Sequence, residues 1–364
     1  MLYFAPMKYM EIYEALKTDI SNRVFAETKR LPGEPELCRR FGVARNTVRQ
    51  ALSLLLRQGL IETRKGEGTF ITKRGERKTG VIGLLIPDSS SARFFATLEK
   101  EFRASARTFG YSIVTETVAK GTPEQIINSV RGAARRLVTK RIEGVIFRPH
   151  LNPECAEGNR EVLRLFQRTD TPIVLIDSDV TMPPERSGCN LVAIDNIAAG
   201  RRIADHLIQR KRKRIAFLMT GHSIGPNINW ANRLFGLAGE AAVRGFDNGV
   251  STLRFPPSDA DALRKLFRSR NKPDAIVCGN DETAVALADT VKAIGKRIPE
   301  DVAIVGFDDD DCSRMSMPPL TTIRQPAKLI AKTALKTLLA YIRYQNSEPR
   351  EILLDAPLVI RKST

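Results

Sequence analysis

The stretch Phe41-Gly-Val-Ala-Arg-Asn-Thr-Val-Arg-Gln-Ala-Leu52 decides the fold of the first part of the chain. Its apolar residues recur at helical spacing, so we expect a helix over residues 45–58 that stops at the following glycine. We expect one face of this helix to be buried, consisting of Val48, Leu52, Leu55 and Leu56.

The opposite face of the same helix carries polar side chains that suit base edges in DNA. An arginine can donate to both acceptors of guanine, and an asparagine or glutamine matches adenine. Recognition helices read bases with their first turns, where these residues lie. The sequence therefore predicts a DNA-reading face made of Arg45, Asn46, Thr47, Arg49 and Gln50.

The flanking segments predict a winged helix-turn-helix. Ile12, Leu16 and Ile20 give a first helix one apolar face, and a second helix follows with Leu37 and Phe41 inward. Residues 60–63 and 69–71 predict a two-stranded hairpin after the third helix. We expect the tip of this wing to approach the DNA backbone through Arg64, Lys65 and Gly66.

The charge of the chain is concentrated next to this helix. The formal net charge is +17 over 364 residues. Residues 39–78 hold eleven Lys/Arg and three Asp/Glu, net +8, whereas residues 1–38 hold five and six, net −1. Such a basic block suits phosphate contacts, and we include Arg39 and Arg40 among them.

A change of pattern after residue 71 predicts a second, larger unit. Residues 72–79 are polar and read as a linker. From residue 80 onward short apolar runs alternate with helical stretches, which predicts an α/β fold with parallel sheets. The roughly 285 residues from 80 to 364 are many for one sheet, so we expect two lobes. The expected domains are 1–71, the linker 72–79, and 80–364.

The first unit resembles the GntR-family winged helix over residues 8–71. The resemblance rests on Leu31-Pro-Gly-Glu-Pro-Glu-Leu37, the 41–52 stretch and Gly59-Leu-Ile-Glu-Thr-Arg-Lys-Gly-Glu-Gly-Thr-Phe70. It implies that Arg45, Thr47 and Arg49 contact DNA, with Gly66 in the wing. Family members often carry a DNA-contacting arginine where this chain has Pro35, and Arg39 or Arg40 can substitute for it.

The second unit resembles the effector domain of LacI/GalR regulators, which shares the two-lobed fold of periplasmic sugar-binding proteins. The resemblance rests on several stretches in matching order, among them Gly80-Val-Ile-Gly-Leu-Leu-Ile-Pro87, Pro273-Asp-Ala-Ile-Val-Cys-Gly-Asn-Asp281 and Ile298-Pro-Glu-Asp-Val-Ala-Ile-Val-Gly-Phe-Asp308. The combination of both units resembles arabinose-repressor-type regulators. It implies a ligand site between the lobes, at the carboxyl ends of the strands.

Polar residues at strand ends are the candidates for that site. Asp177, Asn280 and Asp308 each follow an apolar run. By the resemblance, Arg233, Asn280 and Asp308 contact the effector, and Phe94 and Phe95 line the pocket with their rings. Other interpretations stay open: Asn280 as a helix cap, the phenylalanines as core, Asp177 as a turn residue, and Asp308 in a solvated run.

Three further features of the sequence are less decisive. Trp230, the only tryptophan, can stack on a ligand or simply pack. The three histidines have no partner spacing, so we interpret His150, His206 and His222 as structural or surface residues. Residues 89–91 are weaker candidates for the same pocket.

We expect a cytoplasmic, sequence-specific DNA-binding regulator that acts as a homodimer on an inverted repeat. Of the two kinds of regulator, we expect a repressor. The expected effector is a saccharide, and a nucleobase is the alternative. Five scattered cysteines and the lack of nucleotide-binding, serine-elbow or metal motifs predict no enzyme, cofactor or metal. No apolar run reaches the length of a membrane span.

Arg49→Ala should weaken operator binding, because one good base contact contributes about 1–3 kcal/mol of discrimination. The measurement is a gel-shift titration of a folded variant. A change in affinity below about twofold, far less than such a contact provides, would show that this helix does not read the bases.

Overall fold

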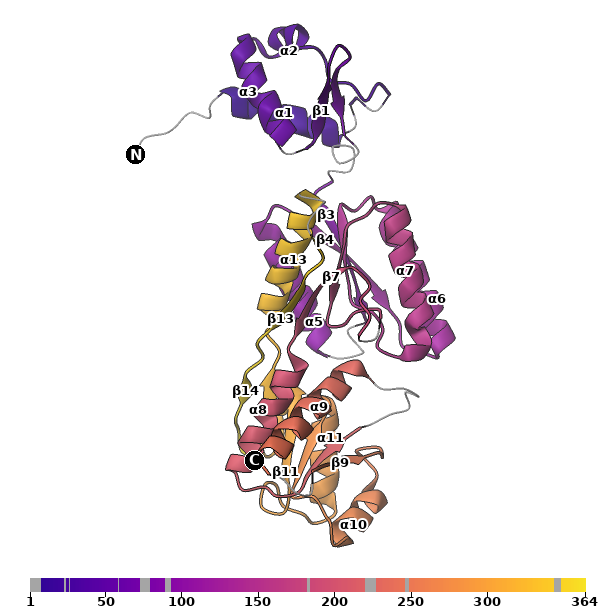
Figure 1. Cartoon of the computed structure of the whole chain (residues 1–364), viewed down its shortest axis with the longest axis vertical. Helices are drawn as coiled ribbons and strands as arrows, with labels where there is room; N and C mark the ends of the chain where they lie inside the picture. Colours follow the sequence, from indigo (N-terminus) through magenta and orange to yellow (C-terminus); the bar gives the residue numbers. More distant parts are fainter. Residues whose placement is uncertain are drawn as a thin grey trace, which may run out of the picture.

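The computed structural model describes residues 8–22, 24–25, 27–57, 59–72, 79–88, 93–181, 184–219, 227–245, 249–343 and 348–364. It forms a small N-terminal head above a two-lobed body (Figure 1). The head contains α1 (Lys8–Ser21), α2 (Glu34–Phe41) and α3 (Arg45–Arg57). An antiparallel hairpin, β1 (Ile61–Arg64) and β2 (Gly68–Ile71), completes the predicted winged helix-turn-helix.

The core of the head follows the predicted helical periodicity with one exception. Ile12, Leu16, Ile20 and Leu37 are all buried. On α3 the prediction for Leu56 is wrong, because its side chain is 41% exposed and Ala51 is buried in its place. At about 100° per residue, position i+8 lies some 80° from Val48, at the edge of the buried face.

The first lobe of the body (the N-lobe) is a six-stranded sheet in the order β13-β7-β6-β5-β3-β4. Every pair in it is parallel. Its strands are β3 (Val81–Pro87), β4 (Ser112–Val118), β5 (Gly144–Phe147), β6 (Ile173–Ile176), β7 (Asn190–Ile194) and β13 (Glu351–Leu354). In Figure 1, α5 (Arg93–Thr108) and α13 (Ala327–Arg343) cover one face, and α6 (Pro123–Thr139) and α7 (Ala156–Arg168) cover the other.

The second lobe (the C-lobe) is a six-stranded sheet in the order β14-β12-β11-β10-β8-β9. Its strands are β8 (Ile215–Leu218), β9 (Val250–Leu253), β10 (Ala275–Cys278), β11 (Ala303–Asp308), β12 (Thr321–Arg324) and β14 (Leu358–Val359). Only the β12–β14 pair is antiparallel. Its helices are α8 (Asn196–Gln209), α9 (Ile228–Val243), α10 (Ala260–Arg268), α11 (Asp281–Ala293) and α12 (Asp311–Met315).

The chain crosses between the lobes three times: from β7 into α8, from β12 into α13, and from β13 to β14. The predicted α/β fold with parallel sheets and two lobes is confirmed. Among the helices of the described residues, none has the length and apolar character needed to cross a bilayer.

Helices α8 and α9 cross so closely that two glycines are required at the contact. A Cβ on Gly200 would lie 2.1 Å from the carbonyl oxygen of Arg233, and one on Gly236 would lie 2.0 Å from that of Ile197. Side-chain atoms at such distances would force the two backbones apart. The crossing therefore fixes where α9 presents Arg233.

Gly200→Ala should lower the free energy of unfolding by about 1–3 kcal/mol or more, because the new methyl group meets backbone that cannot move aside. Gly239→Ala is the matched control on α9: a Cβ there meets nothing within 4 Å, and the residue is exposed. The control should stabilise the protein by about 0.5–1 kcal/mol, as alanine does in a helix interior. Denaturant unfolding measures both, and equal stability of the two variants would refute the close crossing.

Candidate ligand pocket and nucleic-acid interface

The polar face of α3 is exposed and ordered by one carboxylate of α2. The side chains of Arg45 and Arg49 are 65% and 55% exposed, and both pair with Glu34. The hydrogen bond from Arg45 holds the pKa of Glu34 below its usual range. Glu34 thus aligns the two guanidinium groups on the surface. Sequence reasoning missed this role, although Glu34 lies in the quoted second-helix motif.

The other residues predicted to meet DNA are also on the surface of the head. The guanidinium of Arg64 stacks over the ring of Phe70 at 4.6 Å and pairs with Glu62. Gly66 has a φ of 81° at the tip of the wing, which favours glycine. Except for partly buried Thr47, the remaining predicted residues are exposed: Arg39, Arg40, Asn46, Gln50 and Lys65.

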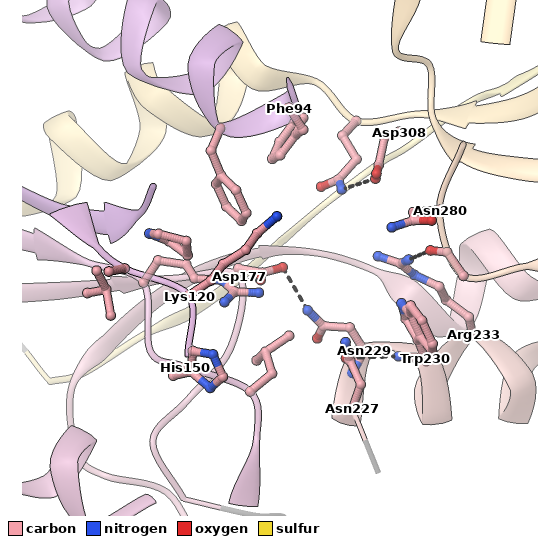
Figure 2. A pocket seen from close by; sticks show the side chains of 18 residues that line it. Phe94, Lys120, His150, Asp177, Asn227, Asn229, Trp230, Arg233, Asn280 and Asp308 are labelled. Atoms are coloured by element: carbon pink, nitrogen blue, oxygen red, sulfur yellow. Dashed lines mark hydrogen bonds and ion pairs between the residues drawn. The ribbon is translucent and has the colours of Figure 1, made fainter. Parts of the chain in front are cut away.

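A cavity of about 320 Å³ lies between the lobes, where the carboxyl ends of the strands from both sheets meet (Figure 2). Its lining includes all six residues predicted for the effector site: Phe94, Phe95, Asp177, Arg233, Asn280 and Asp308. The first three come from the N-lobe and the last three from the C-lobe.

Arg233 is the most enclosed charged group of the cavity, with 5% of its surface exposed. Its Nε donates to Asn196 Oδ1 at 2.8 Å, and its Nη1 donates to the carbonyl oxygen of Gly279 at 2.6 Å. The guanidinium also lies 3.4 Å from the centre of the Phe307 ring. Burial lowers the pKa of Arg233 to about 10, so it stays charged at neutral pH.

Asp308 faces the same space from the end of β11. Its Oδ1 accepts a hydrogen bond from Gln325 Nε2 at 2.7 Å. Burial raises the pKa of Asp308 well above its usual value, while the charge of Arg233 opposes this shift. Asp308 is thus partly buried in the lining and is not part of a solvated acidic run. A carboxyl shifted in this direction can donate as well as accept.

Asp177 joins the two lobes. Its Oδ2 accepts from Arg148 Nε at 2.9 Å within the N-lobe, and its Oδ1 accepts from Asn229 Nδ2 of α9 at 2.7 Å. The residue has a left-handed φ of 72°, as expected for a turn after β6. Asp177 is thus both a turn residue and a lining residue, and each of its oxygens already has a partner.

Three aromatic rings contribute to the apolar part of the lining, beside Pro87, Val118, Ala119 and Leu151. Phe94 and Phe95 meet edge to face, with ring centres 5.8 Å apart. Trp230 lies against the end of β10, where a Cβ on Gly279 would be 2.2 Å from its indole ring. The rings belong to the pocket and also pack against the core.

Asn280 has both of the roles that the sequence left open. Its Oδ1 accepts from the backbone N–H of Thr283 at 2.9 Å and so caps α11. The same residue lines the cavity, where Figure 2 shows its amide beside Arg233.

His150, which we interpreted as a structural or surface residue, also lines the cavity. Its Nδ1 accepts from the backbone N–H of Asn152 at 3.2 Å, which leaves the proton on Nε2 in the neutral ring. Burial, together with the charge of Arg148, lowers the pKa of His150 to about 4. His150 is therefore a neutral donor at physiological pH.

Other lining residues had a usable signal in the sequence. Lys120 and Arg148 follow β4 and β5. The expectation that polar residues after a strand line the site, which we call the strand-end rule and which identified Asp177, therefore applies to them as well. Asn227 and Asn229 follow no strand directly and gave no such signal, whereas Gln325 follows β12, whose residues Thr321–Arg324 contain no apolar run. Residues 89–91 and His222 lie outside the described residues.

Comparison with known proteins confirms the predicted resemblance. Residues 8–71 match the family described as bacterial regulatory proteins, gntR family, and residues 204–364 match the periplasmic binding protein-like domain. The arabinose metabolism transcriptional repressor of Halalkalibacterium halodurans is 24% identical over 98% of this chain and 96% of its own length. The HTH-type transcriptional repressor PurR of Photobacterium profundum is 29% identical over 78% of this chain and 81% of its own.

A solved structure has the same overall architecture. The complex of the transcriptional regulator CelR with cellobiose superposes with a TM-score of 0.65 and covers 99% of this chain and 100% of its own. At 20% identity this likeness shows the shared fold. Proteins that match nearly the whole chain thus include a transcriptional repressor and a transcriptional regulator of the same fold.

Asp281→Asn should flatten the pH dependence of stability between about pH 4 and 7. Asp281 is fully buried, and it accepts from Thr322 Oγ1 at 2.6 Å and from the N–H of Asp310 at 2.8 Å. Burial raises its pKa to about 7. In this window the folded protein binds a proton that the unfolded chain has lost, so stability falls as pH rises from about 4 to about 7.

The measurement is the free energy of unfolding at several pH values in both proteins. The asparagine can keep both hydrogen bonds, by accepting from Asp310 and donating to Thr322. Parallel curves for the wild type and the variant between pH 4 and 7 would show that Asp281 does not titrate in this range.

Proposed function

We propose that this chain, which joins a GntR-family winged helix to a periplasmic binding protein-like body, is a transcriptional repressor whose affinity for operator DNA is set by a saccharide in the interlobe cavity. The observation that carries this proposal is the convergence of directional polar groups from both lobes on one cavity. Arg233 and Asn280 come from one lobe, and His150 comes from the other. A ligand that contacts both lobes stabilises one arrangement of them over others.

The chemistry of the lining supports a saccharide. A polyol needs donors and acceptors in fixed directions, which Arg233, Asp308 and Asn280 supply, and His150 adds one more donor. The rings of Phe94, Phe95 and Trp230 offer flat apolar faces to the C–H faces of a sugar. The relative that spans 98% of this chain is a repressor of arabinose metabolism.

A nucleobase is the second candidate effector. The repressor PurR that matches 78% of this chain supports it. The guanidinium of Arg148 lies 5.1 Å from the centre of the Phe95 ring. An aromatic ring such as that of Phe95 can also stack on a planar heterocycle. A ligand screen that includes sugars and nucleobases separates the two.

For DNA binding we propose that the head covers residues 1–71, the linker 72–79 and the effector unit 80–364. The exposed face of α3 would read bases, while the wing and the basic side chains near it would contact phosphates. One recognition helix reads too few base pairs for specificity, so we propose a homodimer on an inverted repeat.

Coupling between the two units requires that the effector favour one arrangement of the lobes. The hydrogen bond between Asp177 and Asn229 already links the lobes across the cavity. Closure or opening around this link changes the positions from which two bodies present their heads. A coupling of about 1–3 kcal/mol would change operator affinity about 5–150-fold.

Arg233→Ala and Asp308→Ala should abolish the response to effector and leave operator binding intact, because both side chains lie in the cavity and none of the DNA-reading residues contacts them. The operator is first enriched from genomic fragments with the full-length protein. Affinity is then measured with and without arabinose, cellobiose, sugar phosphates and hypoxanthine. The ligand that alters wild-type binding is tested on the variants.

Arg244→Ala is the matched control, because it removes an exposed arginine at the end of the same helix. The control should respond like the wild type. A normal response in Arg233→Ala and Asp308→Ala would place the effector elsewhere.

A further inference from the structure

The far end of the C-lobe carries a dense group of cations that the proposed function does not use. Three loops enter the amino ends of β8, β10 and β11, which are neighbouring parallel strands. These loops, residues 210–214, 268–274 and 295–302, hold ten Lys/Arg and three Asp/Glu, net +7. We call this surface the distal basic face. It includes the run Arg210-Lys-Arg-Lys-Arg214.

Hydrogen bonds join the three loops into one surface. Arg214 Nε donates to the carbonyl oxygen of Lys272 at 2.7 Å, and Arg212 Nη2 donates to that of Pro299 at 2.8 Å. The carboxylate of Asp274 accepts from the backbone N–H groups of Lys213 and Arg214. The backbone positions that carry these cations are therefore fixed relative to one another.

Most of these cations are unpaired. The side chains of seven make no hydrogen bond or ion pair within the described part of the chain: Arg210, Lys211, Lys213, Arg268, Arg270, Lys272 and Lys296. Two of the three acidic residues are already engaged, since Asp274 binds backbone N–H groups and Asp301 pairs with Arg297. Residues 196–324 hold 20 Lys/Arg and 15 Asp/Glu, net +5, so the whole positive excess of this stretch lies on the distal basic face.

We propose that the distal basic face binds the phosphate backbone of a second DNA duplex, so that the protein can bridge two DNA segments. Cations held at an edge with little opposing charge are what sequence-independent binding to phosphates needs. The exposed large apolar side chains of the described residues all lie outside these loops. A protein partner would be expected to need such an apolar centre.

The position of the face separates it from the head. Figure 1 shows α10, which leads into the second loop, at the opposite end of the long axis from α1–α3. The carboxyl ends of the same strands point to the ligand cavity, so the face is also separate from the effector site. One straight duplex cannot contact the head and the distal basic face of one protomer together.

The test is a bridging assay with the full-length protein and two 40-base-pair duplexes of mixed sequence, one biotinylated and one fluorescent. Streptavidin beads should retain the fluorescent duplex only when the protein holds both. The variant Lys213→Gln/Arg270→Gln/Lys272→Gln removes three exposed cations of the face. The matched variant Arg160→Gln/Arg164→Gln/Arg168→Gln removes three exposed cations from α7.

We expect the wild type and the α7 variant to bridge, and the distal variant to lose bridging while it still binds a single duplex through its head. The loss of three phosphate contacts should make the plot of log affinity against log salt concentration less steep by about 2.7. Between 50 and 200 mM salt, such a difference in slope changes the affinity for the captured duplex about 40-fold. Equal bridging in all three proteins would assign capture to the heads and overturn the proposal. Retention of fluorescent polyglutamate but of no second duplex by the wild type would also overturn it.

Discussion

The burial of one positive charge between two lobes is the constraint on which the body depends. Arg233 has lost most of its water, and burial of an uncompensated charge is costly. The close crossing of α8 and α9 brings Asn196 to its Nε, and the end of β10 brings the Gly279 carbonyl oxygen to its Nη1. The crossing requires glycine at positions 200 and 236, because any side chain there would force the two helices apart. The pocket is therefore built by backbone approach as much as by its own side chains.

The same constraint makes the cavity selective. The groups around Arg233 satisfy part of its hydrogen-bonding capacity and leave the cavity lined by Asp308, Asn280 and neutral His150. A ligand without matching donors and acceptors would leave these polar groups unpaired. The free-energy penalty of the unpaired groups would then exceed the favourable energy of the ligand's other contacts. Parallel strands from both sheets end here, so the lining is shared between lobes, and occupancy can be converted into relative motion.

Much of the fold was predictable because it rests on periodicity. The apolar spacing of α1 and the alternation of strands and helices require no knowledge of tertiary contacts. Leu56 was wrongly predicted to be buried because it lies at the edge of the apolar face of α3. Only packing against the rest of the head determines how wide the buried part of that face is. The strand-end rule found Asp177, Asn280 and Asp308, since topology alone brings such residues to one edge. It could not find Asn229, which reaches the cavity from a helix start, or Gln325, which follows a strand without an apolar run. Nor could it predict the exclusion of water that keeps His150 neutral.

The most direct test of the central claim is a thermal-shift screen of the purified full-length protein against monosaccharides, disaccharides, sugar phosphates and nucleobases. A ligand at 100 times its dissociation constant adds about 2.7 kcal/mol to the stability of the form that binds it. The account predicts that one sugar raises the unfolding temperature of the wild type and has no effect on Arg233→Ala. A sugar that stabilises both proteins equally, or stabilisation by nucleobases alone, would contradict it.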